Sequence, residues 1–249
     1  MDNICCIIPA RYQSSRLPGK PLLVINGKTI IERTYLQTKK SQLINKIIIA
    51  TDDDRIVEHV KSFGGEVIKT DIDCLNGTER ICHILDKIDN KYDIIVNVQG
   101  DEPFIDHKNI DLSISKYLEN KHHRDMVCTT IHYQLTELDD ITNRGIGKLI
   151  VDNQDNIIYC SRAMIPHNKN GIYNPETNYY GHIGIFVFRR SYLPLYLTNG
   201  NTPAQLTEDI EWLKIIEMGY KIKSYLVEYS EIGINTTEDF NYLSKKYSN

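Results

Sequence analysis

The sequence has no long apolar segment. No apolar run approaches the roughly 18 residues that a membrane-spanning helix needs. The start, Met1-Asp2-Asn3 followed by five apolar residues, lacks the basic region and the long apolar core of a signal peptide. We therefore predict a cytoplasmic protein without a membrane partner.

Paired cysteines and excess positive charge are missing as well. The six cysteines, at positions 5, 6, 74, 82, 128 and 160, form no CxxC pair and no spacing typical of metal ligands, which indicates a reducing compartment. The formal net charge of -4 leaves no overall basic footprint for nucleic acid, so we expect no nucleic-acid partner. Any positive charge that matters for function must be local.

The common phosphate-binding fingerprints are absent too. No GxGxxG follows the first apolar run, and Gly145-Ile146-Gly147-Lys148-Leu149 lacks the spacing and the hydroxyl of a Walker loop. This excludes the usual dinucleotide and P-loop sites.

What the sequence does have is a rigid cationic segment near its start. The run 9–22 follows a predicted buried strand at 4–8 and carries Arg11, Arg16 and Lys20 among three prolines. Cations on a stiff loop after a first strand are typical of phosphate sites. The run predicts an anion-binding loop, with a solvated basic surface loop as the alternative.

An acidic residue stands at the end of another strand. Asp101 follows the very apolar run 93–98 and is next to Glu102 and Pro103. Because Mg²⁺ prefers one or two carboxylates together with substrate phosphates, an aspartate facing the cationic loop predicts a metal-nucleotide site. The alternative is that Asp101 only caps the next turn.

Strand and helix patterns alternate through the first half. Strands are expected at 4–8, 46–51, 66–69 and 93–98, separated by helices from Thr29 to about Ser41, from Asp52 to Gly64, and along the apolar face of 81, 84, 85 and 88. This alternation of strands and helices predicts a parallel sheet with crossover helices. Ligands of such a sheet bind beyond the carboxyl ends of its strands.

The second half of the sequence has a different pattern, with several strands before the next helix. Strands are expected at 126–133, 147–151, 157–160 and 181–189, with helices at 207–218 and at the C-terminus. We predict a single domain over 1–249: an α/β three-layer fold with a mostly parallel central sheet and an inserted antiparallel β-rich region at about 125–190.

Two further features have competing interpretations. The run 76–80, Asn-Gly-Thr-Glu-Arg, suits a helix start whose free N–H groups and Arg80 meet a base or a phosphate, but an ordinary capped helix has the same pattern. His182 lies within a predicted strand, where a structural histidine is the commoner case.

Several blocks together resemble one enzyme family. IPARYQSSRLPGKPL (8–22), ATD (50–52), GTER (77–80), NVQGDEP (97–103), SRAMIP (161–166) and HIG (182–184) run in the order found in the CMP-Kdo synthetases, the 3-deoxy-manno-octulosonate (Kdo) cytidylyltransferases. The resemblance implies a Rossmann-like nucleotidyltransferase fold of the GT-A-like kind, a homodimer, and Mg²⁺ as cofactor. The implied reaction couples CTP to the anomeric hydroxyl of the sugar acid and releases pyrophosphate.

The resemblance also implies roles for individual residues. The catalytic set is Arg11, Arg16, Lys20 and Asp101; the nucleotide site comprises these three cations with Pro9, Ala10, Ser15, Asn76, Gly77, Thr78 and Arg80; the sugar-acid site comprises Gln99, Arg162, His182, Gln205 and Glu208; and the metal ligands are Asp101 and Asn235.

Some positions depart from the family pattern. Asn235 stands where a second metal-binding aspartate is usual, Gly181 in place of an arginine, Phe186 in place of a tyrosine, Gln205 in place of a glutamate, and Cys74 and Asn76 in place of a histidine and a serine. Three hypotheses stay open: a Kdo cytidylyltransferase, the same chemistry on a modified Kdo such as an 8-amino form or on another ulosonic acid, and a weakly active or non-catalytic nucleotide-binding paralogue. The intact cations and Asp101 argue against the third.

Overall fold

The parallel half of the main sheet is built on β1 (Ile4–Ala10), the strand that precedes the cationic loop. In this computed structural model, which describes residues 2–14, 16–228 and 232–247, β1 pairs in parallel with β4 (Lys46–Thr51) and β6 (Ile94–Val98). Next to β4 lies the parallel edge strand β5 (Val67–Lys69). All four predicted strands and their parallel pairing are confirmed.

The second half continues the same sheet with mostly antiparallel strands. β11 (Ile185–Arg189) pairs antiparallel with both β6 and β7 (Met126–Leu135), and so joins the two halves. Within the described residues, ten strands form the sheet in the order β5-β4-β1-β6-β11-β7-β10-β8-β9, with β12 also paired to β7. The remaining bounds are β8 (Lys148–Val151), β9 (Ile157–Ser161), β10 (Tyr179–His182) and β12 (Lys221–Val227), and a separate small sheet holds β2 (Val24–Ile25) and β3 (Lys28–Thr29).

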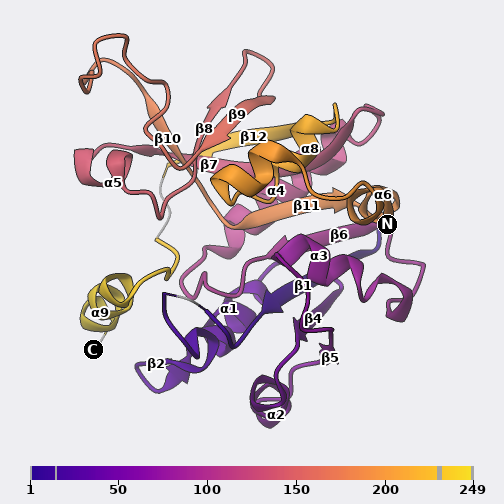
Figure 1. Ribbon diagram of the computed structural model, residues 1–249. Coiled ribbons are helices and arrows are strands. Elements are labelled where there is room, and N and C mark those ends of the chain that lie inside the picture. Colours follow the sequence, from indigo (N-terminus) through magenta and orange to yellow (C-terminus); the bar gives the residue numbers. More distant parts are fainter. Residues whose placement is uncertain (1, 15, 229–231, 248–249) are drawn as a thin grey trace.

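Helices cover both faces of the sheet (Figure 1). One core cluster packs α3, α6 and α8 against the sheet, and a second packs α1, α2 and α4 against the opposite face. The bounds are α1 (Ile30–Thr38), α2 (Asp54–Ser62), α3 (Gly77–Cys82), α4 (His107–Asn120), α5 (Leu138–Thr142), α6 (Leu193–Thr198), α7 (Pro203–Glu208), α8 (Leu213–Glu217) and α9 (Thr237–Lys246), with short 3₁₀ turns at Lys20–Leu22, Leu85–Lys87 and Arg190–Tyr192. This is the predicted three-layer α/β fold.

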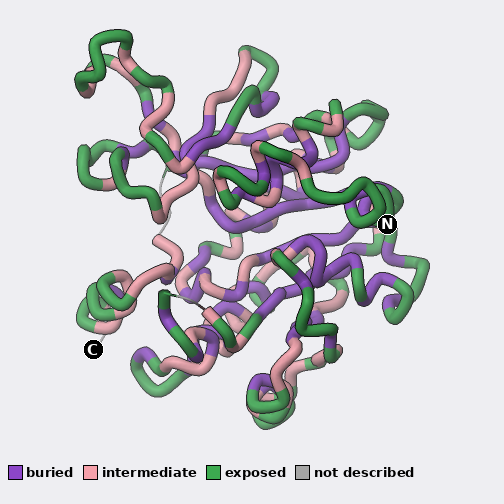
Figure 2. Tube along the Cα trace, viewed as in Figure 1, coloured by how far each residue is buried: buried purple, intermediate pink, exposed green. Residues whose placement is uncertain are grey.

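Alternation along β1 explains the two clusters. Cys5 and Ile7 belong to the first, while Cys6 and Ile8 belong to the second, because successive strand residues point to opposite faces. The whole of β1 is buried, and the central strands appear as continuous buried stretches in Figure 2. A strand covered on both faces holds the start of the cationic loop rigidly.

Side-chain caps begin the helices that border this loop. The Thr29 hydroxyl accepts the N–H of Glu32 at 3.2 Å to start α1, and Asp53 and Asn76 cap α2 and α3 in the same way. The predicted starts of all three helices are confirmed. At the C-terminus, Leu243 of α9 packs into a small cluster with Leu17 of the cationic loop and Ile234.

Two predicted elements are each split in the structure. The expected strand 181–189 is β10 followed by β11, because the chain stays beside β7 but changes its other neighbour from β8 to β6 between His182 and Ile185. The expected helix 207–218 is α7 followed by α8, because Asp209 adopts a left-handed conformation with φ of 52°. Both breaks lie at the cavity described below.

Other elements differ from the sequence expectation. The predicted helix over 81–88 ends at Cys82 and continues as a 3₁₀ turn, although its four apolar residues are buried as expected. Several elements were not anticipated. They include α4, which packs on β7, β12, which follows α8, the short helices α5 and α6, and the small sheet of β2 and β3.

Candidate active site

A cavity of about 670 Å³ opens at the carboxyl ends of β1 and β6. This is the end of a parallel sheet at which ligands bind. The cavity is lined by 9–11, 14, 16, 20–21, 74–77, 80, 99–102, 133, 140, 143–147, 162, 182–184, 209, 211–212, 232–233, 235–236 and 238–239.

The cationic loop forms one wall of this cavity. Arg11, Arg16 and Lys20 all line it, together with Pro9 and Ala10. A bond from the Gly19 N–H to the Tyr12 carbonyl at 3.0 Å closes the loop, and Gly19 has a positive φ of 69°, which favours glycine. Ser15, a predicted nucleotide ligand, lies outside the described residues.

Lys20 and Asp101 form an ion pair on the wall of the cavity. The Lys20 ammonium donates to Asp101 Oδ2 at 2.6 Å and to the Ile234 carbonyl at 2.8 Å. Both side chains are mostly buried, with 14% and 23% of their surface exposed. The two features that the sequence singled out separately therefore belong to one site.

Asn235 lies beside this pair. The Ile234 N–H donates to the Asp101 carbonyl at 2.9 Å, and Asn235 and Asp101 both line the cavity. The oxygen donors of an aspartate and an amide suit Mg²⁺ when substrate phosphates and water complete its shell. No group of three His, Cys, Asp or Glu side chains suited to a metal is found in the described ranges.

Glu102, next to Asp101, is a buried acid that the sequence analysis left without a role. Burial, reinforced by the charge of Asp101, raises its pKa to about 8. Its carboxyl oxygen accepts the N–H of Gly184 at 3.2 Å. Glu102 thus ties the break between β10 and β11 to the end of β6.

The start of α3 forms a second wall of the cavity, but not all of its side chains line the cavity. Asn76, Gly77 and Arg80 line the cavity, whereas Thr78 does not. The Arg80 guanidinium is buried and bound to Asp52, at 3.2 Å, and to Thr70. Arg80 therefore holds the ends of β4 and β5 beside the site.

The predicted sugar-acid residues divide into two groups. Gln99, Arg162 and His182 line the cavity, whereas Gln205 and Glu208 do not. The Gln205 side chain accepts the Thr202 N–H in the capping box of α7, and Glu208 accepts the Ser161 hydroxyl at 2.8 Å. A substrate contact for Gln205 and Glu208 stays a prediction.

His182 is held in its neutral form. Burial lowers its pKa to about 3, assisted by His132 and Arg162. The ring is hydrogen-bonded to the Thr130 hydroxyl at 2.9 Å and stacks with Trp212 at 4.0 Å between ring centroids. An uncharged imidazole at this position offers polar contacts without adding charge.

Gly181, where the resembling family usually has arginine, has a steric explanation. A Cβ atom there would lie 2.9 Å from the Tyr133 ring, and Tyr133 lines the cavity. The tyrosine ring therefore occupies the space that a side chain at position 181 would need.

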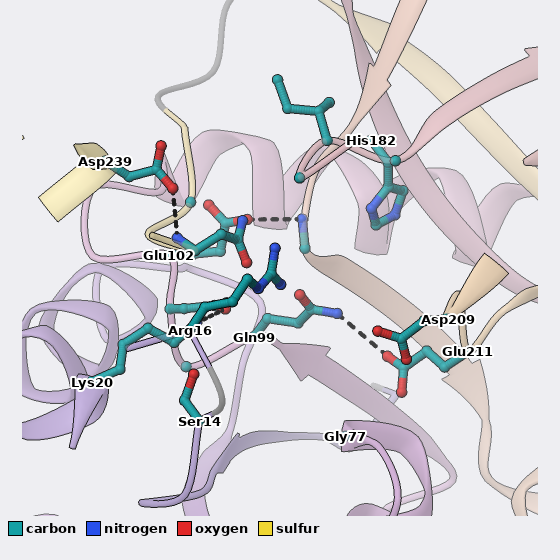
Figure 3. A pocket seen from close by; sticks show the side chains of 18 of the residues that line it. Ser14, Arg16, Lys20, Gly77, Gln99, Glu102, His182, Asp209, Glu211 and Asp239 are labelled. Atoms are coloured by element: carbon teal, nitrogen blue, oxygen red, sulfur yellow. Dashed lines mark hydrogen bonds and ion pairs between the residues drawn. The ribbon is translucent and has the colours of Figure 1, made fainter. Parts of the chain in front are cut away.

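Sequence reasoning missed several cavity residues. Glu211 is partly buried, and desolvation raises its pKa. Its carboxylate accepts the Thr78 N–H at 2.9 Å and the Gln99 amide at 3.3 Å, and Figure 3 shows the second of these bonds. Asp209 and Trp212, its neighbours, also line the cavity. The signal that could have revealed them is the cluster of acids in an otherwise apolar helical pattern, which was interpreted as one continuous helix.

Comparison with known proteins agrees with this geometry. The sequence model of the cytidylyltransferase family matches residues 5–224. The protein named 3-deoxy-manno-octulosonate cytidylyltransferase in Protochlamydia amoebophila is 40% identical over 96% of this chain and 92% of its own length. One of the same name in Fusobacterium nucleatum is 42% identical over 94% of this chain and 92% of its own.

A solved structure is similar over its full length. CMP:2-keto-3-deoxy-manno-octonic acid synthetase, complexed with CTP, superposes with a TM-score of 0.89 at 28% identity, covering 99% of each chain. No helix of the described part of the chain is long and apolar enough to cross a membrane. On the sequence matches and this shared fold, the chain belongs to the 3-deoxy-manno-octulosonate cytidylyltransferase family.

Proposed function

We propose that the protein couples CTP to the anomeric hydroxyl of Kdo, giving CMP-Kdo and pyrophosphate. The observation that carries the proposal is the single cavity in which the cationic loop, Asp101 and the residues Gln99, Arg162 and His182 meet. The names of relatives at 40% and 42% identity, and of the similar structure with CTP, support the same reaction.

The residues of the cavity suit this chemistry. Transfer of a nucleotidyl group depends on positioning and charge neutralisation more than on reactive side chains. Arg11, Arg16 and Lys20 line one wall, where they would neutralise the triphosphate and the leaving pyrophosphate. The start of α3, with Asn76 and Gly77, would border the cytosine.

The metal of the site is proposed to be Mg²⁺. Asp101 and Asn235 would hold it, and when bound it would neutralise phosphate charge at the reacting end of the triphosphate. Lys20, bonded to Asp101, fixes the direction of that carboxylate. The loss of one acidic ligand at position 235 weakens this site relative to one with two aspartates.

Three proposals concern the whole protein. We propose a homodimer, a cytoplasmic location and a single domain over 1–249, all from the sequence. The described cysteines, all buried thiols without a disulfide, are compatible with that location.

A second candidate keeps the chemistry but changes the acid to a modified Kdo or another ulosonic acid. The observation that favours it is the Tyr133 ring beside Gly181, which changes the sugar end of the cavity. The cationic loop, by contrast, keeps Arg11, Arg16 and Lys20 on the cavity wall.

The test is pyrophosphate release from CTP and Mg²⁺ with sugar acids offered one at a time. Release that is fastest with Kdo supports the main proposal, and a clear preference for an 8-amino form or another ulosonic acid supports the second candidate. CTP binding without release for any acid would leave a non-catalytic nucleotide-binding protein.

A further inference from the structure

Lys148, the first residue of β8, is a buried cation with no role in the reaction proposed above. Its side chain is fully buried, and its ammonium donates to the carbonyls of Asn143 at 2.6 Å, Ile146 at 2.8 Å and Arg162 at 2.7 Å. An ammonium has three N–H groups, so these acceptors use all of them. No carboxylate of the described ranges lies within ion-pair distance of it.

The carbonyls that Lys148 binds belong to two segments that line the active-site cavity. All five residues of the 143–147 loop line it, and so does Arg162 at the end of β9. The side chain of Lys148 thus joins the loop to the neighbouring strand from the protein interior.

Arg162 binds the same loop from a second direction. Its guanidinium donates to the carbonyls of Gly145 at 3.1 Å, Glu208 at 3.1 Å and Asp209 at 2.7 Å. We call Lys148 and Arg162, with the carbonyls that they bind, the carbonyl clasp. The clasp connects the 143–147 loop to β9 and to the end of α7.

The far end of the loop contacts the proposed sugar-acid residues. The Gly147 carbonyl accepts the N–H of His182 at 2.9 Å, and a Cβ atom on Gly147 would lie 3.4 Å from the Trp212 ring. Trp212 in turn stacks on His182. A displacement of the loop would therefore move the wall around His182.

A buried lysine at this position has an unfavourable desolvation free energy. Burying a charge without a counter-ion costs free energy that backbone carbonyls offset only when their geometry is right. Burial, together with the charge of Arg162, lowers the pKa of Lys148 to about 8. A methionine would fill a similar volume without that cost, so the ammonium serves to fix its three acceptors.

We propose that Lys148 is a positioning residue for the sugar acid: by binding three carbonyls it holds the 143–147 loop against His182 and Trp212 and so shapes the sugar-acid end of the cavity. This inference rests on the proposed function. It assigns Lys148 to substrate recognition through the loop, not through contact with the substrate.

The kinetic test is Lys148→Met, which keeps the length of the side chain and removes its charge and donors. We expect the KM for the preferred sugar acid to rise at least about tenfold, while the KM for CTP stays within about threefold. The matched control is Lys214→Met. Lys214 on α8 is also buried, lies over the Tyr196 ring and does not line the cavity. We expect the Lys214→Met substitution to lower the melting temperature without changing the KM for CTP or for the sugar acid.

Two results would overturn the inference. In the first, the KM of Lys148→Met for the sugar acid stays within about twofold of the wild-type value. In the second, the KM values change equally in both lysine variants. If Lys148→Met does not fold, Lys148→Gln, which removes the charge and keeps two N–H donors on a shorter side chain, takes its place in the same comparison.

Hydrogen exchange separates this inference from the proposed function, because it needs no reaction. Backbone amides of the 143–147 loop should exchange at least about tenfold faster in Lys148→Met than in wild type, and those in Lys214→Met should not. Unchanged exchange would refute the positioning role, whereas faster exchange in a protein that releases no pyrophosphate would refute only the proposed reaction.

Discussion

At the scale of single residues, the site depends on charges held by specific partners. Lys20 is fixed between the Asp101 carboxylate and the Ile234 carbonyl, so its ammonium is already positioned before any phosphate arrives. Residue type and position in the chain were enough to identify both members of this pair. Glu211 was missed because its role depends on partners far away in the sequence, Thr78 and Gln99.

Removal of the Lys20 charge should damage the reaction itself. We expect Lys20→Ala to lower the rate of pyrophosphate release by at least about 10²-fold, the scale for losing one charge partner of a transition state. The matched control is Lys28→Ala, which removes an exposed ion pair with Glu32 outside the cavity and should leave the rate unchanged. Equal rates for the two variants would show that Lys20 does not act on the triphosphate.

Position 235 should set the metal requirement. Restoring a negative charge with Asn235→Asp should lower the Mg²⁺ concentration needed for half-maximal rate, because a carboxylate binds Mg²⁺ more strongly than an amide oxygen. Asn199→Asp, outside the cavity, is the control for added charge. An unchanged requirement would mean that residue 235 does not touch the metal.

Buried histidines should make stability depend on pH. Burial lowers the pKa of His132 to about 4, and its ring is bonded to the Ser224 hydroxyl. An unfolded histidine has a pKa of about 6.5, so between roughly pH 6.5 and 4 the unfolded chain binds a proton that the folded chain does not. The stability that comes from keeping His132 neutral is complete above about pH 6.5 and is lost as the pH falls toward its folded pKa.

Urea unfolding at pH 7 and pH 5 tests this. His132→Gln should reduce the loss of stability between the two pH values by up to about 1.4 kcal/mol per pH unit. His122→Gln, at an exposed position, should not. An identical pH dependence in wild type and His132→Gln would contradict the assignment.

At the scale of elements, the sequence predicted the parallel strands and the capped helices but not the breaks. Apolar periodicity continues through 181–189 and through 207–218, and it masks the local signs of each break, which are Gly184 in the first range and the acids around Asp209 in the second. Those ends are set by distant contacts: Glu102 binds the Gly184 N–H, and Glu211 binds the Thr78 N–H. Both breaks place polar groups in the cavity, which a continuous strand or helix would not do.

The break between β10 and β11 requires a residue without a side chain. A Cβ atom at Gly184 would lie 2.9 Å from Glu102 Oε1 and 3.0 Å from the Gln99 Cβ. Gly184→Ala should therefore lower the free energy of unfolding by roughly 1–3 kcal/mol, the usual cost of overpacking, and also reduce activity through Gln99. Chemical denaturation with a parallel rate assay measures both, and wild-type values for both would refute the close packing.

At the scale of the whole molecule, the order of strands decides where the site forms. β11 joins the parallel half to the β-rich half, so the cationic loop after β1 opens into the same cavity as Arg162, which follows β9, and His182, the last residue of β10. The sequence predicted both halves, because each has its own hydrophobic pattern. It did not predict that β12 would add to β7, since long-range pairing leaves no local pattern.

In the proposed reaction, the cavity transfers the cytidylyl group of CTP to a sugar acid. The most direct measurement is phosphorus NMR of the protein with CTP, Mg²⁺ and Kdo. Our account predicts that the triphosphate signals disappear while pyrophosphate and a new phosphodiester appear in equal amounts, and only when the sugar acid is present. Cleavage of CTP to CDP and phosphate, or release of pyrophosphate without a phosphodiester, would contradict it.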